Sequence, residues 1–214
     1  MGNINIKCPK NTGSLHFCYK QRFSIVLLAL IDYNRKFLYI DVGAYGKQSD
    51  GGVFRNSSLY REIINHTLDL PPPMPFPGTN EEMPYVMVAD NAFPLSNYLM
   101  KPFPKKNLTL EEIKYNARLS HARVSVERSF GGIVKKFDTL NKPMEIGVDY
   151  AEIIVKCICI LHNIIISLEG LPDDVDQIDI TNLNVRPMSV IRDNNASSNE
   201  ARNIRNSFKI FLNS

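Results

Sequence analysis

The stretch FSIVLLALIDYNRKFLYIDVG, residues 23–43, decides the fold. Residues 23–32 form a near-continuous apolar run, which is typical of a strand covered on both faces. Residues 33–35 predict a short turn, and residues 36–43 alternate side chains with the period of a return strand. The stretch therefore predicts an antiparallel hairpin in the middle of a sheet, and residues 5–9 predict the end of a preceding strand closed by a proline.

The segments that follow the hairpin alternate between loops and short elements. A glycine-rich loop is expected over residues 43–54 and a short helix from Ser57. The proline-rich residues 70–84 predict an irregular surface loop, because proline lacks a backbone donor. The apolar residues 85–89 predict a buried strand, and residues 93–104 a short helix that ends before a proline.

Two long helices are predicted in the second half of the chain. The first spans residues 107–140 and contains Thr109 and Glu112 at the spacing of a capping box. The second spans residues 148–170 and is apolar nearly all round, so it is expected to be buried, with Asp149 as its cap and Gly170 as its stop. Strands first and long helices later indicate an α+β or mixed α/β domain with helices packed on the sheet.

Bulk composition is ordinary for a soluble globular protein. The 214 residues are 44% hydrophobic and 22% charged, with a formal net charge of +3, which only weakly indicates a polyanionic partner. The apolar stretches are short or interrupted, so no membrane span is predicted. The four cysteines form no CxxC pair and indicate a reducing compartment. Cys157, Cys159 and His162 are interpreted as core residues rather than metal ligands.

The composition changes after residue 170. Residues 171–198 are rich in Asp, Asn and Ser and predict a poorly ordered segment. Residues 201–212 have the pattern of a short amphipathic helix. We therefore expect one domain over residues 1–170 and a polar tail over residues 171–214.

Three acidic residues stand out by position. Asp90 ends the apolar strand, Glu127 lies within the first long helix, and Asp50 lies in the glycine-rich loop. Carboxylates are the ligands that Mg²⁺ and Mn²⁺ prefer, and paired ions activate a water for phosphodiester cleavage. The alternative interpretation makes Asp90 and Asp50 turn residues.

The helix around Glu127 is strongly basic. Arg123, Arg128 and Lys135 lie on it, and a basic helix beside carboxylates suits a phosphate backbone. A solvated helix face is the alternative interpretation. A strand-end Asp and a helical Glu can reach one cation, so Asp90 and Glu127 are predicted to converge.

Five stretches together resemble the DDE nuclease domain of PIF/Harbinger transposases and their domesticated relatives. They occur in the family's order between residue 5 and about residue 167 and read GSLHFCYKQRFSIVLLALID, FLYIDVGAYGKQSDGGVF, VADNAFPLSNYLMKPFP, YNARLSHARVSVERSFGGIVKKF and ILHNIIIS. The resemblance implies an RNase H-like fold, a mixed sheet flanked by helices. It also implies a Mg²⁺- or Mn²⁺-dependent nuclease that acts on DNA phosphodiester bonds.

The resemblance assigns roles to individual residues. Asp90 matches the family's second catalytic aspartate and Glu127 matches its glutamate, so both are expected to be catalytic and to bind metal. Asp50 matches an aspartate that assists with metal. In the nuclease hypothesis, Arg123, Arg128 and Lys135 of the basic helix are expected to hold the phosphates of DNA.

The start of the chain departs from the family pattern. The family's first catalytic aspartate belongs just before residues 5–9, where this chain reads Met1-Gly2-Asn3-Ile4. We therefore expect a first strand truncated at or past that ligand, and a nuclease that cuts poorly. The alternatives are a non-catalytic domesticated module that binds DNA or a protein, or a gene fragment without selected activity. The family further implies a nuclear location, DNA as partner, a separate DNA-binding protein subunit and no membrane.

Overall fold

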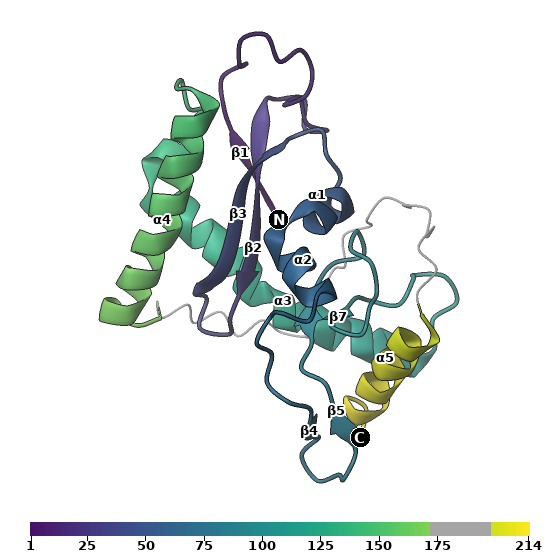
Figure 1. Ribbon diagram of the computed structural model, residues 1–214. Helices are drawn as coiled ribbons and strands as arrows, with labels where there is room; N and C mark the ends of the chain where they lie inside the picture. Colours follow the sequence, from purple (N-terminus) through teal and green to yellow (C-terminus); the bar gives the residue numbers. More distant parts are fainter. Residues whose placement is uncertain (172–197) are drawn as a thin grey trace. The chain divides into compact units, whose positions relative to one another are not determined.

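The computed structural model describes residues 1–171 and 198–214 (Figure 1). Within these ranges the chain forms two compact units. Unit 1 comprises residues 1–65 and 124–171, and unit 2 comprises residues 66–123 and 198–214. The predicted tail falls mostly on residues 172–197, which lie outside the described residues.

A three-stranded antiparallel sheet is the centre of unit 1. Its order is β1 (Gly2–Asn5), β2 (Ser24–Ile31) and β3 (Phe37–Tyr45). The first five residues of β2 are all buried, so the apolar run that predicted a covered central strand is confirmed there. The predicted hairpin is also confirmed, because β2 and β3 pair on either side of the short turn at residues 32–36.

Helices cover the sheet of unit 1. After β3 come α1 (Asp50–Asn56) and α2 (Ser58–Ile64), and later α3 (Leu110–Lys136), η1 (Asp138–Leu140) and α4 (Val148–Glu169). Figure 1 shows α4 beside β3. The core joins the inner face of the sheet to α3 and α4 and contains Ile4, Ile6, Ile25, Leu27, Phe37, Val42, Ile133, Leu140, Met144, Ala151, Val155, Ile158 and Cys159.

Unit 2 contains two short sheets and two helices. β4 (Met74–Pro75) pairs antiparallel with β5 (Glu82–Met83), and β6 (Met87–Val88) pairs parallel with β7 (Leu99–Met100). The first half of α3 and α5 (Asn199–Phe211) enclose its core, which contains Leu95, Met100, Phe103, Tyr115, Leu119 and Ala201. The predicted helix near residues 201–212 is confirmed by α5.

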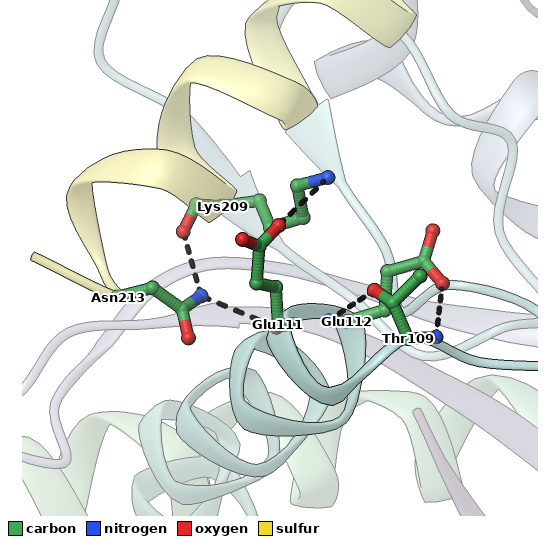
Figure 2. Close-up of polar contacts among 5 residues, drawn as sticks. All are labelled: Thr109, Glu111, Glu112, Lys209 and Asn213. Carbon is green, nitrogen blue, oxygen red and sulfur yellow. Dashed lines mark hydrogen bonds and ion pairs between the residues drawn. The ribbon is translucent and has the colours of Figure 1, made fainter.

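The start of α3 is fixed by the predicted capping box, which Figure 2 shows. The Thr109 N–H donates to the Glu112 carboxylate at 2.9 Å, and the Glu112 N–H donates to the Thr109 hydroxyl at 3.2 Å. The same turn holds α5, because Lys209 lies 3.6 Å from the Glu111 carboxylate and Asn213 donates to the Glu111 carbonyl. These contacts satisfy donors that a bare helix start would leave unpaired.

Three predictions about local elements of unit 2 are wrong in whole or in part. Residues 93–104 form no helix; Met87 and Ala89 instead donate their backbone N–H groups to Tyr98 and Met100, which makes β7. Pro94, Pro102 and Pro104 lie within this segment, and each disfavours a helical backbone at the residue before it. The predicted buried strand at 85–89 shrinks to the half-buried β6, and the proline-rich loop contains the short pairing of β4 with β5.

The glycine-rich loop is also shorter than predicted, because α1 begins at Asp50. Ser49 is its N-cap and accepts a hydrogen bond from Gly52 N–H at 3.3 Å, which offsets the low helix propensity of two glycines. α4 ends at Gly170 as predicted, with a φ of 79°, but its N-cap is Gly147 rather than Asp149.

The prediction that α4 is buried all round is wrong. One face, with Val155 and Cys159, packs in the core, while Ile153, Ile160 and Leu168 are more than half exposed. Cys159 and His162 are core residues as predicted, but Cys157 is exposed. By length and composition alone α4 would suffice to cross a membrane, as core helices of soluble proteins also can, so the expectation of no membrane span stays a prediction.

The fold class is mixed α/β. Within residues 1–171 and 198–214 the strands form three separate small sheets. The RNase H-like sheet that the resemblance implies therefore stays a prediction.

Candidate active site

Asp90 lies two residues after β6, and its carboxylate is oriented by the backbone. Oδ1 accepts a hydrogen bond from the Ala92 N–H at 2.9 Å, which closes a tight turn at the end of the strand. Oδ2 lies 3.9 Å from a guanidinium nitrogen of Arg123, and both side chains are about three-quarters buried, at 21% and 26% exposure. Asp90 is therefore a turn residue whose carboxylate is held in one orientation, and its role as a metal ligand stays a prediction.

Arg123 reaches Asp90 because α3 is clamped to the segment after β7. The Asn116 side chain accepts from the Phe103 N–H at 2.8 Å and donates to the Phe103 carbonyl at 3.1 Å. Asn116 and Arg123 are seven residues apart, which places them on one helix face two turns apart. This face of α3 therefore attaches the helix to the segment after β7 through Asn116 and carries the charge of Arg123 beside Asp90.

The donor set beside Asp90 fits a hard cation. The neighbouring Asn91 side-chain oxygen is buried and accepts no hydrogen bond from any described residue. An amide oxygen and a carboxylate are ligand types that Mg²⁺ and Mn²⁺ take. Asn91 was not singled out from the sequence, although its place directly after Asp90 was a usable signal.

The other predicted site residues belong to unit 1. Glu127 lies on an exposed part of α3, and Asp50 is in the first turn of α1, where an acidic side chain complements the helix dipole. Arg128 is half-buried and Lys135 is exposed, both on α3.

Asp90 and Arg123 are two predicted site residues of one unit that the structure brings together. Arg123 was predicted to hold phosphate, and here it is the counter-ion of Asp90. The described part of the chain contains no group of three or more His, Cys, Asp or Glu side chains placed to hold a metal ion. The convergence of Asp90 and Glu127 on one cation stays a prediction.

Several motif residues have a structural role that the sequence did not reveal. In unit 1 the carbonyl of Arg35, at the hairpin turn, accepts a hydrogen bond from the Ser129 hydroxyl at 2.9 Å and lies 2.9 Å from His162 Nε2. Asn163 makes two bonds of 2.8 Å with the backbone N–H and carbonyl of Phe37. The RSFGG and LHN segments thus hold the turn between β2 and β3.

Comparisons with known proteins agree with the resemblance. The family described as DDE superfamily endonuclease matches residues 2–163. The chain is 28% identical over 168 residues to a protein named "Protein ALP1-like" from Arabidopsis thaliana. That match covers 78% of this chain and 41% of the relative, so the chain spans about two fifths of the relative's length. No solved structure matches.

The match to the family covers about three quarters of the chain and includes both units. It contains Asp90 with its oriented carboxylate, the clamps at Phe103 and Phe37, and Glu127 on α3. The chain therefore belongs to the DDE superfamily endonucleases and is a transposase-derived, nuclease-like domain.

Proposed function

We propose that this domain is a divalent-metal-dependent endonuclease that acts on DNA phosphodiester bonds. Its observational support is the Asp90 carboxylate, fixed at the end of β6 and followed by the unpartnered Asn91 oxygen, in a chain of the DDE family. In the proposal Asp90 and Glu127 bind Mg²⁺ or Mn²⁺ and Asp50 assists. Members of the family generally use divalent metals.

Each side chain has a distinct task in this proposal. Bound divalent cations would supply Lewis acidity for a water nucleophile and for the leaving oxygen. The Ala92 N–H holds Asp90 Oδ1, so that Oδ2 keeps one direction. Arg123, 3.9 Å from Oδ2, balances the carboxylate charge. A bound cation would replace Arg123 beside Asp90, and Arg123 would then pair with a DNA phosphate. Arg128 and Lys135 contact the phosphate backbone.

Plasmid nicking tests the proposal directly. Supercoiled DNA is incubated with the full chain and Mn²⁺ or Mg²⁺, and the relaxed form is measured over time. Asp90→Asn and Glu127→Gln are expected to abolish nicking, because each removes a charged metal ligand. Two exposed acids away from the proposed site are matched controls: Asp69→Asn and Glu145→Gln should keep full activity. Nicking that survives Asp90→Asn refutes the assignment.

A non-catalytic module is the second candidate, and one contact favours it. Arg123 already neutralises Asp90, so the carboxylate needs no cation to be stable in the fold. Calorimetry with Mn²⁺ separates the candidates. Binding that is lost in Glu127→Gln supports the nuclease, whereas no heat with Mn²⁺ together with retained binding of duplex DNA or a protein supports the module.

Partners and location follow from the same proposal. We infer a nuclear protein that binds DNA, works with a separate DNA-binding protein subunit and does not insert in a membrane. The basic residues of α3 support DNA as partner, because phosphate contacts dominate such affinities. Binding of labelled duplex DNA that weakens steeply with salt, and weakens further in Lys135→Ala, is the expected result.

A further inference from the structure

A stripe of apolar side chains runs along the outer face of α4. It comprises Tyr150, Ile153, Cys157, Ile160, Ile164 and Leu168, and we call it the α4 stripe. Its five large members are between 47% and 81% exposed. Its size and continuity set it apart from single exposed apolar residues, which are normal on protein surfaces.

The spacing of the α4 stripe is that of a helix–helix seam. Successive members are three, four, three, four and four residues apart, close to the 3.5-residue average of a coiled coil. The opposite face of α4, with Ala151, Val155 and Cys159, is fully buried in the core of unit 1. The helix is therefore apolar on two faces, and within residues 1–171 and 198–214 only one of them packs in a core.

We propose that the α4 stripe pairs with the α4 stripe of a second copy of this chain. A fully exposed large side chain has an accessible area of about 200 Å², so the exposed parts of the five large members amount to about 600 Å². This area is at the upper end of the range for the largest apolar patch on a typical monomer, about 300–600 Å². Two copies would bury about 1,200 Å² in total, which reaches the size of a specific interface.

A two-fold pair of identical helices suits this surface. The stripe is self-complementary, because each apolar position meets another apolar position of the same stripe. One pair of flanking charges is neutralised within the chain, because Glu152 lies 3.8 Å from Lys156 on the same helix. Insertion of α4 in a membrane would instead require Val155 and Cys159 to leave the core, where each is at most 1% exposed. The second copy is thus the occupant that keeps unit 1 intact.

Sedimentation equilibrium of the full chain tests the proposal. Wild type is expected to have twice the chain mass of 24.3 kDa at micromolar concentration. Ile160→Glu should raise the dimer dissociation constant at least tenfold, because it places a charge in the seam. The matched control is Ile113→Glu on α3, where the same residue type is similarly exposed, at 50% against 57%. It should leave the dimer unchanged.

Alkylation of cysteines gives a readout that does not depend on a variant. Cys8 and Cys157 are both exposed, and only Cys157 lies in the α4 stripe. Reaction of Cys157 with a maleimide should slow as protein concentration rises, while Cys8 should react at a constant rate.

Three results would overturn the proposal. They are a wild-type chain that stays monomeric at high micromolar concentration, an Ile160→Glu variant that dimerises like wild type, and a Cys157 reaction rate independent of concentration. Flotation of wild type with phosphatidylcholine–phosphatidylserine vesicles, lost in Ile160→Glu, would also overturn it and assign the stripe to a lipid surface. The proposal is independent of the nuclease assignment, since dimerisation needs neither metal nor DNA.

Discussion

Asn163→Ala should destabilise unit 1, and the structure sets the size of the effect. The Asn163 side chain makes two hydrogen bonds of 2.8 Å, one from the Phe37 N–H and one to the Phe37 carbonyl. Phe37 is buried, so its backbone groups gain little water when the amide is removed. Each unsatisfied group costs about 1–3 kcal/mol, and alanine returns about 0.5 kcal/mol in helix propensity. With two such groups, the free energy of unfolding should fall by about 1.5–5.5 kcal/mol.

Urea unfolding followed by circular dichroism measures this loss. Hydrogen exchange at the Phe37 amide gives the local readout, because the chain has two units and global unfolding need not be two-state. Asn141→Ala is the matched control. Its side chain also bonds a backbone carbonyl, that of Val134 at 3.2 Å, but in an exposed position, so the loss should stay below about 1 kcal/mol. Equal losses in the two variants, with unchanged exchange at Phe37, would refute the reasoning.

Three further predictions concern unit 2 and the cysteines. Burial raises the pKa of Tyr115 to about 12, and the positive charge of Arg205 partly opposes this rise. The pKa of tyrosine in the unfolded chain is about 10, so the unfolded chain loses its proton first as pH rises. The free energy of unfolding is therefore unaffected by this group below pH 10 and falls as pH rises from 10 toward 12. Tyr115→Phe should flatten that loss in pH-dependent urea unfolding and should not destabilise at pH 7, because no described residue hydrogen-bonds the hydroxyl. Thr109→Ala removes the capping-box acceptor and should cost about 1 kcal/mol by urea unfolding, whereas Thr79→Ala, whose hydroxyl bonds an exposed turn carbonyl, should cost less. Burial raises the pKa of Cys159 to about 12, so its alkylation at pH 8 should require unfolding, while Cys8 reacts at once.

The strongest local patterns were enough to predict the hairpin of unit 1 and the start of α3. The run at residues 24–31 and the capping box at Thr109 each depend on local chemistry that the sequence carries directly. The short elements of unit 2 were mistaken because their backbone pairs with distant segments, as Ala89 does with Met100. Local propensity does not report such pairings.

The burial of α4 was predicted wrongly for a related reason. Composition predicts that an apolar helix is buried, but it does not state whether the chain itself covers both faces. In the same way the sequence marked Asp90 and Glu127 as acids of interest, but it could not show that Arg123 is the partner of Asp90. That contact depends on the clamp between Asn116 and Phe103, which joins α3 to a segment that was predicted to be helical and is not.

The family motifs divide into residues that hold the fold and residues that the fold does not need. Ser129, His162 and Asn163 secure the hairpin turn of unit 1, so a domain without catalytic activity would still retain them. Asp90 is different, because asparagine in its place keeps an oxygen for the Ala92 N–H and loses only a partly exposed ion pair. Asp90→Asn should therefore change the free energy of unfolding by less than about 1 kcal/mol. A loss as large as that of Asn163→Ala would make Asp90 a structural residue and remove the physical reason for assigning it to chemistry.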